Sequence, residues 1–189
     1  MKEQTLVLLK PDTVQRGIIG EILTRFEKTG LKIIGLKMIQ ADDSISGQHY
    51  TNDQAWLLSV GEKTIQSYKS KGVRIEKTSL QIGQDVRHML IEFLKSSPTV
   101  AVCLEGHGAI EKVRTIIGST APSNAMPGTI RADYSLDSYT LADNKGRAVA
   151  NLVHASDTKE NAQREIKIWF STNELCVYER ADEYLLYGE

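Results

Sequence analysis

A histidine flanked by small polar residues, His154, is the strongest candidate for covalent chemistry in this sequence. It lies in the segment Asn151–Asp157 (NLVHASD), at the predicted entrance of a helix. A neutral imidazole has one nucleophilic nitrogen, and its other N–H needs an acceptor that fixes the tautomer. A carboxylate on the following helix could serve as that acceptor. The pattern alone leaves open whether His154 is a nucleophile or an ordinary histidine at the edge of the core.

A second candidate is the loop Gly128-Thr129-Ile130-Arg131. Glycine lets backbone amides approach an anion, threonine offers a hydroxyl, and arginine can bind phosphate oxygens with both arms of its guanidinium. The loop therefore predicts an anion site, although a turn with a solvated arginine would have the same pattern.

Two common nucleotide-binding motifs are incomplete. Gly106 and Gly108 stand between a predicted strand and helix, but Glu111 replaces the third glycine of a dinucleotide-binding turn. Gly72 and Lys77-Thr78 imitate a P-loop without the glycine that precedes its lysine. We set both aside.

The elements that must position these residues follow from the apolar pattern. The predicted strands are Thr5–Lys10, Leu31–Ile39, Thr99–Leu104 and Leu175–Tyr178. The predicted helices are Ile18–Lys28, one capped by Ser44 or Ser46 that runs through His49 and Tyr50, residues 85–96, Ala109–Ile117 closed by Gly118, and a last helix capped by Asp157 or Thr158. This alternation favours an α/β or α+β sandwich.

Two stretches lack such order. Gly118–Asn151 reads as a long loop, which in a compact domain is often functional. Residues 57–84 are polar and lysine-rich, and they predict a helix with a loop.

Composition excludes several classes of protein. The chain has 189 residues and 41% hydrophobic content, which suits one domain. A net charge of −1 and 6% aromatic residues argue against binding to nucleic acid, and no apolar run has the length of a membrane span. Cys103 and Cys176 are expected to be free thiols, and we expect no secretory signal, because Met1–Gln4 runs straight into an apolar strand-like segment. We therefore expect a cytoplasmic protein.

Several further motifs follow in order along the chain. They are Thr5–Asp12 (TLVLLKPD), Gln15-Arg16-Gly17, Gly20-Glu21-Ile22, Arg25-Phe26-Glu27, Gly30–Ile33, His49-Tyr50, Val113-Arg114, Gly118–Pro122, Pro127–Arg131, Asn151, His154–Asp157 and Glu165. With this set the sequence resembles the nucleoside diphosphate kinase family over nearly its whole length.

The resemblance implies a fold and an activity. The fold is a ferredoxin-like antiparallel sheet covered by helices on one side, in a single domain over residues 1–189 that assembles into a homo-oligomer, usually a hexamer. The activity is transfer of the terminal phosphate of a nucleoside triphosphate, typically ATP, to a nucleoside diphosphate by a ping-pong mechanism through phosphorylated His154. The alternative is a catalytically silent regulatory or binding protein on the same fold.

The resemblance also implies the roles of individual residues. His154 would be phosphorylated, Glu165 would orient its other ring nitrogen, and Tyr50 would border it. Phosphate and ribose would be held by Lys10, Arg114, Thr120, Arg131 and Asn151. Mg²⁺ would be bound mainly by the nucleotide phosphates, without a protein metal site. These roles agree with phosphoryl transfer, in which catalysis is mostly positioning and electrostatic stabilisation.

The chain departs from the family pattern in two insertions, about residues 56–84 and 138–148. They predict solvated or subunit-contact surface, or a remodelled base pocket. Counting back from Ser97-Pro98 places Val86 where the family stacks a phenylalanine on the base. Trp56 and Tyr68 are the candidates to replace that ring, and we expect broad use of purine and pyrimidine nucleotides.

Overall fold

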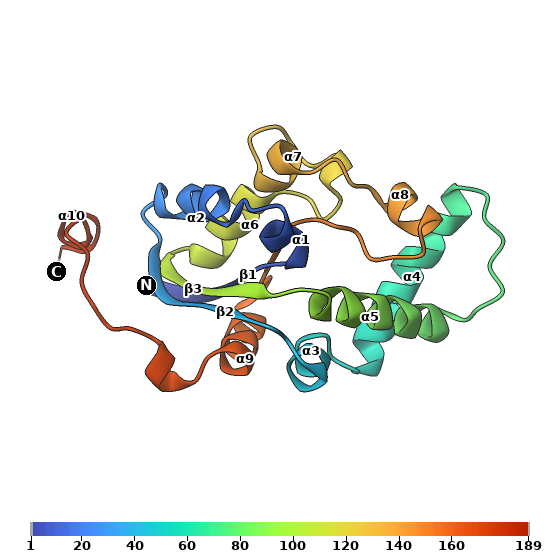
Figure 1. Ribbon diagram of the computed structural model, residues 1–189, viewed down its shortest axis with the longest axis horizontal. Coiled ribbons are helices and arrows are strands. Elements are labelled where there is room, and N and C mark those ends of the chain that lie inside the picture. The colour runs from blue at the N-terminus through green and yellow to red at the C-terminus, as the bar shows by residue number, and fades with distance from the viewer. Residues whose placement is uncertain (1, 189) are drawn as a thin grey trace.

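A four-stranded antiparallel sheet forms the centre of the computed structural model, which describes residues 2–188 (Figure 1). Its strands are β1 (Lys2–Leu9), β2 (Lys32–Ile39), β3 (Thr99–His107) and β4 (Val153–Ala155). They lie in the order β2-β3-β1-β4, and β1 pairs antiparallel with both β3 and β4. This α+β arrangement confirms the ferredoxin-like sheet that the sequence predicts.

Helices lie in the connections between the strands and after the last strand, β4. They are α1 (Pro11–Gln15), α2 (Ile19–Glu27), α3 (Asp43–His49), α4 (Gln54–Ser70), α5 (Ser79–Lys95), α6 (Ala109–Ile117), α7 (Ile130–Tyr134), α8 (Tyr139–Asn144), α9 (Lys159–Trp169) and α10 (Glu183–Tyr187). Two short 3₁₀ helices, η1 (Pro122–Asn124) and η2 (Thr172–Glu174), stand between them. In residues 2–188 no helix is both long and apolar enough to cross a membrane.

Helices cover both faces of the sheet, so the expectation of helices on one side is wrong. Val7 of β1 belongs to a core cluster with Phe26 of α2, while Leu6 and Leu8 belong to a second cluster with Trp169 of α9. Successive side chains of a strand point to opposite faces, and β1 is apolar at all of these positions. Both faces therefore need a cover, and Figure 1 shows α2 and α6 on one side and α9 on the other.

The predicted final strand, Leu175–Tyr178, is also wrong. This segment has no regular secondary structure, and Val177 is fully exposed. One backbone bond, from Cys176 N–H to the Ile34 carbonyl at 2.7 Å, replaces the ladder that a strand would need. The fourth strand is instead β4, which the prediction missed because it has three residues with the polar His154 at its centre.

The helices predicted from the sequence are present, but several of their boundaries differ from the prediction. Asp42, not Ser44 or Ser46, caps α3, and its Oδ1 accepts the Ile45 N–H at 2.7 Å. Thr158 caps α9, as one of the two predicted alternatives. Residues 57–84 contain a helix and a loop as expected, but α5 begins at Ser79 rather than at residue 85. The stretch 118–151 is not one long loop, because it holds η1, α7 and α8.

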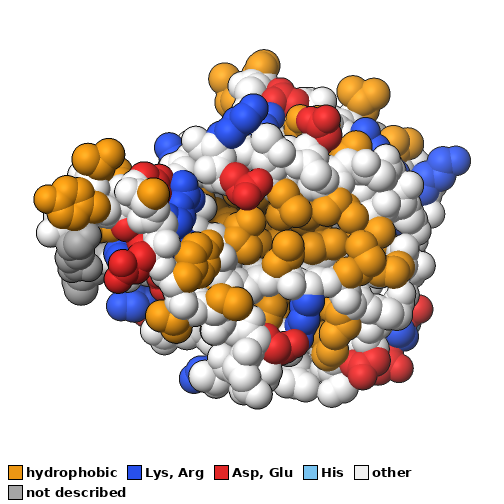
Figure 2. Space-filling model, turned by 60° about the vertical axis from the view of Figure 1, so that its left-hand side comes forward, with side chains coloured by type: hydrophobic (Ala, Val, Ile, Leu, Met, Phe, Trp, Pro, Cys, Tyr) orange, Lys and Arg blue, Asp and Glu red, His pale blue; other side chains and the backbone are white. Residues whose placement is uncertain are grey.

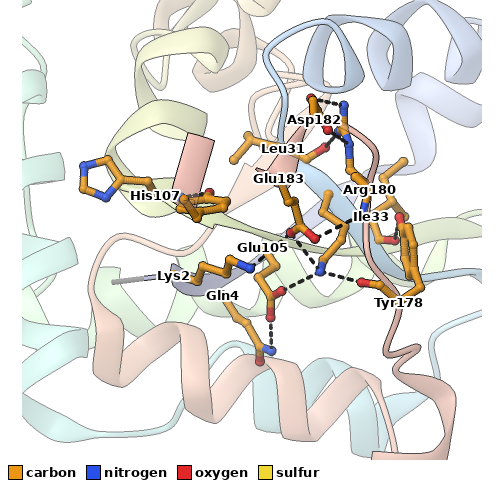
Figure 3. Close-up of polar contacts among 12 residues, drawn as sticks. Lys2, Gln4, Leu31, Ile33, Glu105, His107, Tyr178, Arg180, Asp182 and Glu183 are labelled. Atoms are coloured by element: carbon orange, nitrogen blue, oxygen red, sulfur yellow. Dashed lines mark hydrogen bonds and ion pairs between the residues drawn. The ribbon is translucent and has the colours of Figure 1, made fainter. Parts of the chain in front are cut away.

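An ionic cluster fastens the C-terminal segment to the sheet (Figure 3). The buried ammonium of Lys32 lies 3.1 Å from Glu105 and 3.0 Å from Glu183, and it donates to the Tyr178 carbonyl at 2.8 Å. The backbone N–H of His107 donates to the hydroxyl of Tyr187 at 3.1 Å. Residues 178–187 are thereby fixed at the end of the sheet opposite β4.

Helices α4 and α5 pack with their backbones in contact. A Cβ atom added to Gly61 would lie 1.8 Å from the Ser79 carbonyl oxygen, and one added to Gly83 would lie 2.1 Å from the Leu57 oxygen. Only glycine permits such an approach. The helix of the first insertion, α4, is therefore packed against α5, whereas residues 71–78 form an exposed loop.

We expect Gly83→Ala to destabilise the protein by about 1–3 kcal/mol, because the added methyl group must push the two helices apart. Gly20→Ala is the matched control, since a Cβ there meets no atom within 4 Å and alanine favours the helix. Urea unfolding of both variants measures the difference. Equal stability of the two would show that the close approach of α4 and α5 is dispensable.

Candidate active site

One cleft of about 640 Å³ is lined by all eight residues that the sequence singles out. They come from every part of the chain: Lys10 follows β1, Tyr50 follows α3, Arg114 is on α6, Thr120 is in the loop after it, Arg131 is on α7, Asn151 and His154 are at β4, and Glu165 is on α9. The fold thus brings together residues that lie far apart in the sequence, from Lys10 to Glu165.

His154 meets a carboxylate at the base of this cleft. Its Nε2 lies 2.9 Å from Oε2 of Glu165, and its side chain is 26% exposed. An ionised carboxylate only accepts hydrogen bonds, so Nε2 must carry the proton of the neutral ring. The Nδ1 atom then holds the lone pair, and in the part of the chain that the structure describes no group bonds to it.

Glu165 stays ionised although it is buried. Burial alone would raise the pKa of this carboxyl, but the hydrogen bond from His154 and the donation by Ser156 Oγ at 2.7 Å lower the pKa to about 2. Arg164 adds a contact at 3.2 Å to the other oxygen. The carboxylate is therefore a fixed negative charge beside the imidazole.

A second histidine, His49, packs edge-on against His154. Their ring centroids are 4.5 Å apart at an angle of 83°. The indole N–H of Trp169 donates to His49 Nδ1 at 3.3 Å, and burial holds the pKa of His49 well below its usual value. His49 therefore stays neutral and adds no positive charge that would compete for Glu165.

Arg131 is buried, and its side chain is hydrogen-bonded to the backbone segments that line the cleft. Its guanidinium donates to the carbonyls of Gly118 at 2.8 Å, Asn151 at 3.2 Å and Val153 at 2.6 Å. Asn151 in turn donates through Nδ2 to the Thr120 carbonyl at 2.7 Å. These bonds join the loop after α6 to β4, and they orient the remaining N–H groups of Arg131.

The backbone before β4 adopts a strained turn that places His154. Leu152 has a φ of +67°, in the region that favours glycine. Its N–H donates to Asp12 Oδ2 at 2.8 Å, and its carbonyl accepts from Lys10 N–H at 2.8 Å and from Thr13 Oγ1 at 2.7 Å. Three bonds to the start of the chain thus hold this turn.

The ammonium of Lys10 is almost completely buried. Burial lowers its pKa from 10.5 to about 8, against the opposing effect of Asp12, and Arg131 lowers it further. The Nζ atom lies 4.8 Å from the ring centroid of Phe93 on α5. A polyanion that enters the cleft would supply the counter-charge that Lys10 needs in its charged form.

Two predicted binding residues remain open to solvent. Arg114 and Thr120 are exposed at the wall of the cleft. Arg114 contributes to the lowering of the Arg131 pKa to about 10, after the larger effect of burial. Lys10, Arg114 and Arg131 thus concentrate positive charge in a protein whose net charge is −1.

A second cavity adjoins the first. It has a volume of about 370 Å³, and its lining includes Val86 and Tyr68, whereas Trp56 lines the first cleft. The two cavities share Lys10, Leu90, Thr120 and Asn151. Three of the shared residues, Lys10, Thr120 and Asn151, are among the five expected to hold phosphate and ribose.

Sequence reasoning missed several residues that shape the site. They are Asp12, His49, Ser156, Arg164 and Trp169. Asp12 bonds to a residue 140 positions away, for which the local sequence holds no signal. Ser156 could have been found from the sequence, because it stands two residues after His154 in the same polar segment. In the structure its Oγ donates to the carboxylate that also contacts His154.

Comparison with known proteins decides the family. The family model described as nucleoside diphosphate kinase matches residues 3–57 and 60–175. The chain belongs to the nucleoside diphosphate kinase family. Its activity is accordingly that of a nucleoside diphosphate kinase, a phosphotransferase that binds nucleotides. Residues 176–188, which include α10, lie beyond the matched range.

Relatives within the family are similar along the whole chain. The enzyme of Pyrobaculum aerophilum is 43% identical over 178 residues, covering 92% of this chain and 97% of the relative. Its crystal structure superposes with a TM-score of 0.91 over 94% of this chain and 100% of that one. The enzyme of Borrelia burgdorferi, solved with bound vanadate and ADP as a transition-state mimic, has a TM-score of 0.80 at 35% identity and covers 97% and 96% of the two chains.

The pKa of Lys10 predicts how nucleotide affinity depends on pH. Below about pH 8 the side chain is charged before binding, whereas above it the neutral amine must take up a proton to pair with phosphate. ADP affinity should therefore fall by up to about tenfold per pH unit above pH 8. Equilibrium titrations with ADP from pH 7 to 9.5 measure this, and an affinity that stays constant over that range would contradict it.

Proposed function

We propose that this enzyme transfers phosphate by a ping-pong mechanism in which Nδ1 of His154 is phosphorylated. The observation that carries the proposal is the contact of 2.9 Å between His154 Nε2 and the ionised Glu165. It fixes the proton on Nε2 and leaves Nδ1 nucleophilic inside a positively charged cleft.

Each half of the reaction exchanges one bond for another. Nδ1 attacks the terminal phosphorus of a nucleoside triphosphate, an N–P bond forms, and the bond from phosphorus to the bridging oxygen breaks. The nucleoside diphosphate leaves with the electron pair of that bond. Positive charge develops on the imidazole, and Glu165 stabilises it without taking its proton. A second nucleoside diphosphate then attacks the phosphorus and regenerates His154.

The remaining residues of the cleft bind and orient the substrate in this proposal. Lys10, Arg114 and Arg131 balance the charge that spreads over the moving phosphoryl group, and Thr120 and Asn151 supply directional hydrogen bonds to phosphate or ribose. Tyr50 lines the same cleft as His154, and its ring lies edge-on against His49 with the centroids 4.8 Å apart. Burial raises the pKa of this tyrosine above its usual range, so it remains a neutral hydroxyl.

The residues of the cleft fit a Mg²⁺ ion that is bound by the nucleotide and not by protein ligands. Glu165 is already engaged by His154 and Ser156, so the cleft offers cations and N–H donors more than free carboxylate ligands. Bound by the phosphate oxygens, Mg²⁺ would neutralise part of their charge. Nucleoside di- and triphosphates are the proposed substrates, in keeping with the ADP in the Borrelia burgdorferi structure and the CDP in that of Halobacterium salinarum.

We further propose a single-domain cytoplasmic enzyme that assembles into a homo-oligomer, with a hexamer favoured. Hydrophobic side chains gather on the face of the molecule that Figure 2 shows. Leu36 and Met38, on the edge strand β2, are 51% and 57% exposed. An exposed apolar edge strand is an aggregation hazard unless another surface covers it, and a second copy of the chain is the cover we propose.

The alternative of a catalytically silent protein on the same fold has less support. A silent relative has no need to keep a buried carboxylate aligned with a histidine, since an isolated buried charge is costly. Here the carboxylate, the imidazole and the cations share one cleft.

Labelling with γ-labelled ATP tests the proposal. His154→Ala should lose acid-labile label and lower turnover by several orders of magnitude, because the nucleophile and its partners act as a unit. His88→Ala, on the exposed side of α5, is the control and should label normally. Label that persists in His154→Ala, on His49, His88 or His107, would assign the carrier elsewhere.

A further inference from the structure

An arginine of α5 holds the C-terminal end of α3, which lies between α5 and α9 (Figure 1). Arg87 donates through Nε to the carbonyls of Tyr50 at 2.8 Å and Thr51 at 3.2 Å. Its Nη2 atom donates to the Gly47 carbonyl at 3.2 Å. The last carbonyls of a helix lack partners inside the helix, and a cation beside them complements the helix dipole. Arg87 therefore caps the end of α3 from a neighbouring helix.

A second arginine, Arg164 on α9, holds the same end of α3. Its Nη1 atom donates to the Gln48 carbonyl at 2.9 Å, while Nη2 lies 3.2 Å from Oε1 of Glu165. A change at Arg164 would therefore also disturb the carboxylate beside the proposed nucleophile. In residues 2–188 the hydrogen bonds of Arg87 end on backbone carbonyls and none reaches Glu165. The hold on α3 can thus be changed at Arg87 without removing a partner of that carboxylate.

The segment held in this way, residues 47–51, carries two side chains that line the cleft of His154. They are His49 and Tyr50. The ring of His49 lies edge-on against the ring of His154 at 4.5 Å and against that of Tyr50 at 4.8 Å between centroids. The imidazole of His154 is thus held by Glu165 at Nε2 and by His49 through ring packing. A shift of about 1 Å in such a group can slow a reaction about a hundredfold.

The face of α5 that bears Arg87 is fixed in the core. Leu94 is fully buried in the same core cluster as Tyr50, and Leu90 and Ile91 pack against that cluster. These three apolar residues stand three, four and seven positions after Arg87, so they lie on the same side of the helix. The close backbone contact with α4 fixes α5 further. Arg87 therefore connects a rigid helical layer with the segment beside His154.

We propose that Arg87 is a positioning residue for phosphoryl transfer, which fixes the end of α3 to α5 and thereby holds His49 and Tyr50 against His154. The inference rests on the proposed function and specifies how its nucleophile is held. Arg87 lies outside the motifs that carry the resemblance to the family, and it does not line the cleft. Its loss should therefore slow the chemical step and leave nucleotide binding by Lys10 and the other cations of the cleft unchanged.

Single-turnover labelling of His154 with γ-labelled ATP in excess tests this role. Arg87→Met keeps the aliphatic stem and removes the three hydrogen bonds. The rate constant at saturating ATP should fall about ten- to a hundredfold, while the ATP concentration that gives half the maximal rate stays within about twofold of wild type. Arg87→Lys keeps the charge and one donor group, so it should recover part of the rate. Arg74→Ala, in the exposed loop 71–78, is the control and should react like wild type.

The amplitude of labelling separates positioning from folding. Unfolded molecules take up no label, so a purely structural role would lower the labelled fraction and the urea midpoint at an unchanged rate constant. That result would overturn the proposal. A loss that appears only in the ATP concentration for half the maximal rate, or no recovery of the rate in Arg87→Lys, would also overturn it. Failure of the proposed function has a different signature, because wild-type protein would then take no label on His154.

Discussion

The buried carboxylate of Glu165 is the interaction on which the arrangement of the cleft depends. Its side chain is 6% exposed, and a buried charge of this kind is stable only with partners close by. His154, Ser156 and Arg164 are those partners. Because the carboxylate binds Nε2, it fixes both the orientation of the imidazole and the nitrogen that carries the proton. The same contact that stabilises the buried charge therefore prepares the proposed nucleophile.

The turn at Leu152 connects this contact to the rest of the fold. A branched residue with positive φ costs about 1–2 kcal/mol, and the bonds from Leu152 to Lys10, Asp12 and Thr13 offset that strain. Those partners follow β1 directly, whereas Leu152 precedes β4. Correct pairing of the first and last strands thus places the histidine, and Lys10 reaches the cleft from the same junction.

The sequence predicted the residues of the cleft better than the elements that hold them. Residue types around His154 indicated chemistry, whereas Lys10 and Glu165 were implied by the resemblance to the family, and the structure collects all three in one cleft. Strand β4 was missed because three residues carry too little periodicity, and Leu175–Tyr178 was predicted as a strand because an apolar run does not reveal whether a partner strand exists. The bond from Leu152 to Asp12 could not be predicted, since it depends on tertiary pairing across 140 residues. The close contact of α4 and α5 depends on two glycines that look ordinary in the sequence.

The central claim is that Glu165 selects the nitrogen of His154 that accepts phosphate. Nuclear magnetic resonance of protein with ¹⁵N-labelled histidine, recorded after phosphorylation by ATP, reports this directly through coupling between phosphorus and nitrogen. The geometry predicts coupling to Nδ1 of His154, with the proton retained on Nε2 beside Glu165. Coupling to Nε2 would require the contact with Glu165 to break before transfer, and it would contradict the account.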